Sequence, residues 1–361
     1  MSWLTRRISY SQTGVDRNLR AESKKALRSL KKTYEFSRFG KVLELPYGRL
    51  FPFHDRYLDV QIEGVGTKVL VAQLAEKYDT IGIDSVAMVV NDVIRSGAKP
   101  LAVVDNIHAQ ISDPFLVKEW LRGIVKGAQE AECIVPAGEI GDVGDLIKGL
   151  HSNKGFDMVC GAVGEVVREK IVRGKNIKPG DPIIGLRSSG VHSNGISLVR
   201  RLLFKEWGGK YAHDTVLTGW EKSVVGEVLE PTTIYVKPVL RLTNRVKIKG
   251  AVHITGDAYL KFDQLRKFSP GIGFEFDNFK PQPIFELIQR TASELGSAIA
   301  DVEMFKTFNM GWGFAVIVDK GERDEALDVL AGAGVISEQI GRVTGSKGIK
   351  VFHKEKRIIL S

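Results

Sequence analysis

The sequence contains little cysteine, and no apolar run in it approaches the length of a membrane span. Only two of its 361 residues are cysteines, Cys133 and Cys160, and they form no CxxC pair. This scarcity argues against a disulfide framework or a cysteine-rich zinc site and is typical of a reducing compartment. A membrane helix needs about 20 apolar residues, and the first residues lack the apolar core of a secretory signal. We therefore expect a cytoplasmic protein that does not contact a membrane.

The common nucleotide and zinc signatures are also missing. No GxxxxGK[ST], GxGxxG or HExxH segment occurs in the chain. Their absence argues against a P-loop, a Rossmann dinucleotide site and a zinc hydrolase site. The seven histidines are scattered, which also argues against zinc. Any nucleotide site must therefore be built from other elements.

The composition is that of an ordinary globular protein, with 43% hydrophobic and 26% charged residues. A chain of 361 residues is long enough for two domains, each with its own core. The polar segment 168–182 has the composition of a linker, with Gly174, Pro179, Gly180 and Pro182. We therefore predict an N-terminal domain over residues 1–170 and a C-terminal domain over residues 171–361.

A net charge of +9 indicates an anionic partner or a basic surface. Much of the excess lies in residues 20–34, where Leu27, Leu30 and Tyr34 form a helical stripe opposite five cations, Lys24, Lys25, Arg28, Lys31 and Lys32. Such a helix can bind nucleic acid or a membrane surface, draw phosphorylated ligands to a nearby site, or be a solvated face. Because no nucleic-acid motif accompanies it, we favour the solvated face and do not expect a nucleic-acid partner.

Both halves of the chain show alternating strand and helix patterns, which predict the α/β class. In the first half we predict strands at 57–63, 100–105, 133–137 and 157–167, and helices at 67–78, 84–97 and 114–131. Asp84 and Asp113 are the expected N-caps of the last two helices. In the second half we predict strands within 183–189, 251–255, 272–276, 312–318 and 335–343, and helices after Asn194 and over 284–295 and 323–334.

Three segments place carboxylates beside glycines or other polar residues. Glu63 ends a predicted strand and is followed by Gly64, Gly66, Thr67 and Lys68 at a helix start. A phosphate can bind the backbone N–H groups of such a turn, with the carboxylate near Mg²⁺. The alternative is a tight strand-to-helix turn with a surface glutamate, and the residues alone do not decide between the two.

The second and third acidic segments are a helix and a loop. In the helix 84–97, four valines share one face, and Asp84, Met88, Asn91, Asp92 and Arg95 share the other. A surface helix gives the same pattern. The segment 137–145 is predicted to be a loop and carries Glu139, Asp142 and Asp145. Carboxylates from several elements, together with Mg²⁺ on nucleotide phosphates, are typical of ATP-using sites. We predict that Glu63, Asp92 and Glu139 hold Mg²⁺ jointly.

The segment "SSGVHSNGISLVRR" (188–201) brackets His192, Ser193 and Asn194 between two glycines before a predicted helix. Glycine lets the backbone approach a ligand, and a helix start offers N–H groups to an anion. A loop in which Ser193 or Asn194 only caps the helix is the alternative. His253 and Trp312 lie beside other polar–glycine junctions, and we expect local hydrogen bonding for the former and packing for the latter.

Seven segments, in order, resemble those of phosphoribosylformylglycinamidine cyclo-ligases, the aminoimidazole ribonucleotide synthetases of purine biosynthesis. They are "SYSQTGVD" (9–16), "GVGTK" (64–68), "DTIGIDSVAMVVND" (79–92), "SSGVHSNGISLVR" (188–200), "EPTTIYVKPVL" (230–240), "HITG" (253–256) and "FKTFNMGWGF" (305–314). The resemblance implies an ATP-binding N-terminal domain that dimerises through its sheet, a C-terminal α/β domain, and ATP, Mg²⁺ and a ribonucleotide substrate at the domain interface. ATP would phosphorylate the formyl oxygen, and the amidine nitrogen would then displace phosphate to close the imidazole ring.

The resemblance also implies roles for individual residues. The expected catalytic residues are His192, which would donate a hydrogen bond or a proton, Lys68 and Asp92. The expected ATP-binding residues are Gly64, Gly66, Thr67, Lys68, Asp84 and Asn91. The expected substrate-binding residues are Ser189, Gly190, Ser193, Asn194, Thr255, Gly256, Asp257 and Asn309.

The chain departs from the family pattern at four places. Glu63 stands where the family usually has aspartate, and "IGDVGD" replaces the usual Thr-Ala after Glu139. The triple glycine after "HIT" becomes Gly256–Asp257–Ala258, and the glycine-rich stretch before residue 57 is reduced. These changes leave room for a paralogous ATP-dependent synthetase or kinase with another substrate. A non-catalytic basic nucleotide- or nucleic-acid-binding protein is the second alternative.

Overall fold

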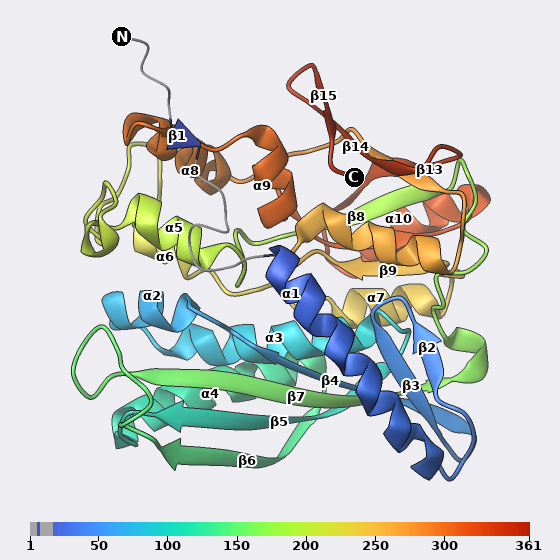
Figure 1. Cartoon of the computed structure of the whole chain (residues 1–361), viewed down its shortest axis with the longest axis horizontal. Coiled ribbons are helices and arrows are strands. Elements are labelled where there is room, and N and C mark those ends of the chain that lie inside the picture. The colour runs from blue at the N-terminus through green and yellow to red at the C-terminus, as the bar shows by residue number, and fades with distance from the viewer. Residues whose placement is uncertain (1–5, 8–16) are drawn as a thin grey trace.

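The N-terminal domain is built on a six-stranded mixed sheet with helices on one face (Figure 1). The computed structural model describes residues 6–7 and 17–361. Across the sheet the strands are β2 (Leu43–Leu45), β3 (Gly48–Phe53), β4 (Arg56–Gly64), β7 (Phe156–Val167), β5 (Lys99–Ala109) and β6 (Ile134–Asp142). Neighbouring strands are antiparallel except β5 and β6, which are parallel. Strand β6 runs through the predicted acidic loop, so Glu139 and Asp142 lie in a strand rather than a loop.

Helices α2 (Lys68–Leu74), α3 (Asp79–Ile94) and α4 (Pro114–Ala131) belong to the same domain. Asp113 caps α4 as predicted, because its carboxylate accepts hydrogen bonds from the N–H groups of Phe115 and Leu116. Helices α3 and α4 touch backbone to backbone: a Cβ on Gly82 would lie 2.4 Å from the carbonyl oxygen of Trp120. Glycine at this crossing therefore brings the two helices unusually close.

The helix α3 is buried on every side, which corrects the predicted N-cap and excludes the alternative of a surface helix. It begins at Asp79, so Asp84 lies inside the helix and is not its N-cap. Its polar face is not a surface, because Asp84, Asn91 and Asp92 are at most 5% exposed. The valine face packs on the sheet through Val93 and on α4 through Val86. The polar face lies beneath the C-terminal half, where α7 (Val236–Thr243) contacts it. Figure 1 shows α3 between the N-terminal sheet and the C-terminal half of the chain.

The C-terminal half forms a second mixed sheet of seven strands. Their order is β15 (Lys356–Ile359), β14 (Gly348–His353), β10 (Gly273–Phe276), β13 (Ser337–Thr344), β8 (Pro182–Arg187), β12 (Trp312–Ile317) and β9 (Gly250–His253). The remaining α-helices are α5 (Ile196–Leu203), α6 (Val224–Val228), α8 (Pro283–Glu294), α9 (Asp301–Thr307) and α10 (Arg323–Gly332). Short 3₁₀ helices are η3 (Arg168–Lys170), η4 (Lys205–Trp207), η5 (Ala258–Lys267) and η6 (Lys320–Glu322). The two sheets draw their strands from residues 43–167 and 182–359, and the boundary at 170 stays a prediction.

The basic segment forms α1 (Arg17–Ser23) and the 3₁₀ helix η2 (Lys24–Phe36), which cross the front of the molecule in Figure 1. No residue of η2 is buried, and Leu27 and Leu30 are about half exposed. The structure thus shows a solvated helix. Near the chain start, β1 (Arg6–Arg7) pairs in parallel with β11 (Ser297–Ala298) of the C-terminal half. The motif at 9–16 lies outside the described residues.

Both cysteines carry free thiols, and Cys160 is buried. Burial raises the pKa of its thiol to about 12 and that of Cys133 to about 11. These thiols are therefore unreactive at neutral pH. Among the described helices, none combines the length and apolar character needed to cross a bilayer.

Candidate active site between the two halves

A fully buried ion pair joins the start of α2 to α3. The Lys68 ammonium lies 2.9 and 2.8 Å from the two carboxylate oxygens of Asp84. Asp84 also accepts hydrogen bonds from the N–H (2.8 Å) and hydroxyl (2.6 Å) of Thr232, and Lys68 donates to the carbonyl of Glu230. Buried ion pairs are stable when such extra hydrogen bonds satisfy them. The pair therefore ties the N-terminal domain to the segment that precedes α7.

Asn91 makes a second connection two turns further along α3. Its amide donates to the carbonyl of Thr233 (2.8 Å) and accepts from the N–H of Tyr235 (2.9 Å). Lys68, Asp84 and Asn91 are each 0% exposed. In this structure their polar atoms hold the two halves together, and their predicted contact with ATP stays a prediction.

The turn after β4 remains open to solvent. Gly66 is exposed and has a φ of +58°, a conformation that glycine adopts without strain. Thr67 is half-buried, and its hydroxyl lies 3.1 Å from that of Ser197 in α5. Gly64 is half-buried. Of the residues predicted to bind ATP, Gly64, Gly66 and Thr67 are therefore the ones that solvent reaches.

His192 is completely buried in the loop before α5 and has a φ of +57°. Its Nε2 accepts a hydrogen bond from the N–H of Ser189 (3.2 Å), which places the ring proton on Nδ1. Nδ1 has no hydrogen-bond partner among the described residues. Burial, then repulsion from His253 and Lys68, lowers the pKa of His192 well below its usual value. A neutral His192 with an Nδ1–H that is free among the described residues suits a hydrogen-bond donor, and its predicted catalytic role stays a prediction.

The rest of this loop is fixed by polar contacts. The Asn309 amide donates to the carbonyl of Gly190 (2.8 Å) and accepts from the Ser188 hydroxyl (3.0 Å). The Ser193 hydroxyl donates to Asp84 (3.2 Å). The Ser189 hydroxyl donates a hydrogen bond to the carbonyl of Pro231. These predicted substrate residues shape the loop, and their contact with substrate stays a prediction.

Asn194 differs from its neighbours because part of its side chain is unsatisfied. Its buried Nδ2 has no hydrogen-bond partner among the described residues. A Cβ on Gly256 would lie 3.7 Å from Asn194 Oδ1, so the loops 188–195 and 253–257 are adjacent. Asp257 and Ala258 have φ values of +68° and +40°, so the backbone keeps a glycine-like conformation where the family has glycine. An unpaired buried amide beside this loop is suited to a ligand.

Asp92 forms the centre of a charged cluster with His253 and Arg95. Asp92 Oδ1 lies 2.7 Å from His253 Nδ1, and Oδ2 lies 2.7 Å from Arg95 Nη2. Burial alone would raise the pKa of Asp92, but Arg95 and His253 hold that pKa well below its usual range. Burial also lowers the pKa of His253 to about 4, despite the opposing effect of Asp92. The imidazole is therefore neutral at pH 7, and its Nε2 has no partner among the described residues.

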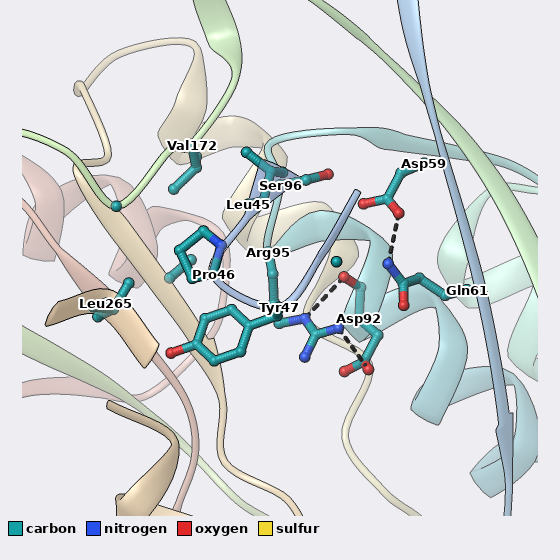
Figure 2. A pocket seen from close by; sticks show the side chains of 13 residues that line it. Leu45, Pro46, Tyr47, Asp59, Gln61, Asp92, Arg95, Ser96, Val172 and Leu265 are labelled. Atoms are coloured by element: carbon teal, nitrogen blue, oxygen red, sulfur yellow. Dashed lines mark hydrogen bonds and ion pairs between the residues drawn. The ribbon is translucent and has the colours of Figure 1, made fainter. Parts of the chain in front are cut away.

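A small cavity lies beside this cluster (Figure 2). Arg95 faces Asp92 there, and its guanidinium lies 5.0 Å from the centre of the Tyr47 ring. Asp59 accepts a hydrogen bond from Gln61 (2.6 Å), and burial raises the pKa of Asp59 to about 6. Residues of both halves line the cavity, including Val172, Gly174, Ala251 and Leu265 from the C-terminal half. The Asp92 cluster thus borders the domain interface.

The structure does not bring Glu63, Asp92 and Glu139 together. Glu63, Cys160, Asp105 and Gly138 form one row across four strands, so Glu63 and Gly138 are about 14 Å apart. Glu139 is the next residue and points to the opposite face of the sheet, because side chains alternate along a strand. No cluster of three acidic, histidine or cysteine ligands occurs within the described part of the chain. Joint Mg²⁺ binding by all three therefore needs more than this single chain.

The predictions missed the partners of Asp92. His253 makes a hydrogen bond, as expected, but its partner is the carboxylate of Asp92, 161 positions away in the sequence. The Nε2 of His253 has no hydrogen-bond partner among the described residues. Arg95 follows Asp92 by one helical turn, a spacing that signals an ion pair. Trp312 is fully buried and donates to the carbonyl of Asn278, as expected for packing.

Comparisons with known proteins cover nearly the whole chain. Residues 50–166 match the model of the AIR synthase related protein N-terminal domain, and residues 178–354 match that of its C-terminal domain. A phosphoribosylformylglycinamidine cyclo-ligase of Thermococcus kodakarensis is 39% identical over 350 residues, 95% of this chain and 98% of that protein. The cyclo-ligase of Methanocaldococcus jannaschii is 37% identical, covering 98% and 99% of the two chains.

Similarity of fold extends to proteins with other names. A crystal structure of thiamine-monophosphate kinase from Stenotrophomonas maltophilia matches with a TM-score of 0.61. It covers 84% of this chain and 88% of the kinase at 17% identity. At this identity the match concerns the fold alone.

Proposed function

This chain belongs to the AIR synthase related family, and we propose that it catalyses the reaction for which its cyclo-ligase relatives are named. The reaction is the ATP-dependent ring closure of formylglycinamidine ribonucleotide to aminoimidazole ribonucleotide, a step of purine biosynthesis. The sequence identity to these two relatives is 37–39%, and the alignments cover nearly the full length of this chain and of each relative. The enzyme is therefore an ATP-dependent cyclo-ligase.

The chemistry requires ATP because a formyl oxygen is a poor leaving group. The oxygen attacks the γ-phosphorus, ADP leaves, and an O-phosphorylated intermediate forms. The amidine nitrogen then attacks the formyl carbon, and phosphate departs with the former formyl oxygen. Loss of an N–H proton closes the C=N bond of the ring, and transfer of a proton from the ring CH2 to the exocyclic imine nitrogen then gives the aromatic aminoimidazole. The protein must hold the amidine near the formyl carbon and stabilise the phosphoryl group during both steps.

The single structural observation that supports a site here is the Asp92–His253 pair. Asp92 holds the imidazole through Nδ1 at 2.7 Å, which fixes the tautomer with Nε2 as an acceptor. A neutral acceptor suits an amidine N–H of the substrate. On the neighbouring loop, His192 Nδ1 and Asn194 Nδ2 are buried donors without partners among the described residues. We assign to these three side chains the orientation of the substrate.

We propose that Glu63, together with the phosphates of bound ATP, would hold Mg²⁺. Glu63 is exposed at the end of β4, but partial desolvation by neighbouring groups, then repulsion from Asp92, raises its pKa. A divalent cation relieves such repulsion between carboxylates. Asp92 suits this role less well, because Arg95 and His253 already occupy its two oxygens. When bound, Mg²⁺ would neutralise charge on the transferred phosphoryl group.

A coupled assay tests the reaction directly. Purified protein with MgATP is expected to release ADP and phosphate only when formylglycinamidine ribonucleotide is added, in equal amounts with the aminoimidazole product. Release of ADP without this substrate would instead indicate a paralogous kinase or synthetase. A basic binding protein would release none under either condition, and this result would contradict the proposal.

We propose further that the enzyme is a homodimer that pairs through the open face of the N-terminal sheet. Val60, Ile62, Val104 and Ile134 share this face and are 58, 72, 43 and 65% exposed. Helices α2, α3 and α4 lie on the opposite face, and η2 crosses this one at its β2–β3 end, where Lys31 pairs with Glu44 and Arg49 lies over the Tyr34 ring (Figure 1). Contiguous exposed apolar side chains on a sheet are typical of an interface. A second copy would bury the same face of both chains.

Ile62→Lys is expected to convert the dimer into a monomer. It places a charge at the most exposed of these apolar positions, and a two-fold axis repeats the charge on both sides of the interface. Sedimentation velocity at micromolar concentration should shift from twice 39.9 kDa to 39.9 kDa. Ile359→Lys is the matched control, since Ile359 is 63% exposed on β15 and lies in the other sheet. A wild-type protein that sediments only as a monomer would contradict the dimer.

A further inference from the structure

Lys261 is a cation of the site that no sequence motif indicated. It lies in η5, directly after the 253–257 loop, and its side chain is half-buried. The ammonium donates hydrogen bonds to the carbonyl of His253 (3.1 Å) and to the hydroxyl of Thr255. The Lys261 carbonyl in turn accepts from the Tyr47 hydroxyl (3.0 Å) of the β2–β3 turn. These contacts fix Lys261 from both halves of the molecule.

The surroundings of Lys261 are charged. The groups that act on its ammonium are Asp92, Arg95, Glu63 and Asp257. Arg95 is already paired with Asp92 at 2.7 Å. Burial lowers the pKa of Lys261 to about 8, and the carboxylates oppose this effect. The side chain is therefore mainly a cation at pH 7.

The hydrogen bonds of Lys261 leave capacity for a ligand. An ammonium has three N–H donors, and the two hydrogen bonds shown above both go to uncharged oxygens. The same loop lies against Asn194, whose Nδ2 is unpartnered among the described residues, and it includes His253, whose Nε2 is likewise unpartnered. The amide donor and the imidazole acceptor thus belong to two adjacent loops, and the third N–H of Lys261 lies on η5, which directly follows one of them.

We propose that Lys261 binds a phosphate group of a reactant and is a further positioning residue for the ring closure. The inference rests on the proposed function, which brings two such groups to the site: the γ-phosphoryl group of ATP and the 5′-phosphate of the ribonucleotide. Lysine binds phosphate as a point charge. Its attachment to Thr255 and His253 holds that charge at a fixed place beside the substrate loop.

Lys261→Met distinguishes the two phosphates. If Lys261 binds the 5′-phosphate, KM for the ribonucleotide should rise about 10- to 100-fold, while the Kd of ATP alone, measured by calorimetry, stays unchanged. If it binds the γ-phosphoryl group, kcat or the affinity for ATP should fall by a similar factor, with KM for the ribonucleotide within twofold. Lys261→Arg keeps the charge and should restore part of either loss.

Lys249→Met is the matched control. Lys249 precedes β9 and lies 2.8 Å from Asp181 and 2.9 Å from Asp319, so it is a largely buried lysine with a structural pairing. Its replacement should lower thermal stability and leave KM, kcat and the affinity for ATP unchanged. A folded Lys261→Met enzyme with all three quantities within twofold of wild type would overturn the proposal.

Two further outcomes separate this proposal from the proposed function. If Lys261→Met does not fold, Lys261→Gln is measured by the same criteria, and failure of both variants to fold would assign Lys261 a structural role and overturn the inference. A wild-type enzyme without turnover would contradict the proposed function instead. In that case the affinity for ATP alone, compared between wild type and Lys261→Met, still tests the ATP form of the inference, and an unchanged value would overturn it.

Discussion

Asp92→Asn is expected to reduce kcat about 100-fold or more while the protein still folds. Asparagine keeps the size of the side chain but removes the negative charge between Arg95 and His253. The imidazole loses the charged acceptor that fixes its tautomer, and losses of this size are common when an electrostatic or orienting group is neutralised at a phosphoryl-transfer site. Steady-state turnover at saturating and at limiting Mg²⁺ measures the effect.

The same substitution should also cost stability, because Arg95 is only 7% exposed and loses its counter-charge. Removal of one member of a buried pair costs about 3–5 kcal/mol, and the asparagine oxygen should recover part of this. Asp79→Asn is the matched control at the start of the same helix, where the carboxylate forms a surface pair with Lys77 at 3.3 Å. It should change stability by less than about 1 kcal/mol and leave kcat unchanged. Near-normal turnover of Asp92→Asn would remove Asp92 from the active site.

Lys68→Met should produce the largest loss of stability of any single substitution considered, about 3–5 kcal/mol. It leaves Asp84 charged and without its cation in a place with no solvent contact. Because Thr232 and Glu230 are bonded to the same pair, the contact between the two halves should loosen as well. Urea denaturation followed by fluorescence and by circular dichroism measures both effects.

The double variant Lys68→Met, Asp84→Leu separates the ion pair from simple loss of packing. With both charges gone, no charge remains buried and unpaired, so the double variant should be more stable than the sum of the single effects implies. Lys77→Met at the surface pair with Asp79 should cost less than about 1 kcal/mol. Strict additivity of the two single substitutions would show that Lys68 and Asp84 do not stabilise each other.

Much of the secondary structure follows from local patterns. Alternation of apolar residues predicted the strand at 57–63, and β4 covers Arg56–Gly64. Asp113 and Pro114 predicted the start of α4, where the cap is formed as expected. Such signals depend on residues a few positions apart, so one stretch of chain contains them. The ordered motifs likewise sufficed to recognise the family, which the comparisons confirm.

Local patterns failed where a second layer changes the environment. The polar face of α3 has the pattern of a surface helix, but the C-terminal half covers it, and Asp84 and Asn91 become interdomain contacts. The glycine-rich acidic segment around Glu139 has the composition of a loop, but pairing with β5 makes it a strand. Propensity is a weak prior, and contacts with the rest of the fold override it.

The sequence by itself determined the α/β class, most elements and the family, because periodicity, capping residues and motif order are properties of neighbouring residues. Only the tertiary structure decided which polar side chains meet. Asp92 and His253 are 161 positions apart, and Lys261 enters the site through the packing of η5 against the β2–β3 turn. Register across the sheet separates Glu139 from Glu63. These distances and faces depend on how strands pair and how the two halves pack, and no local pattern encodes them.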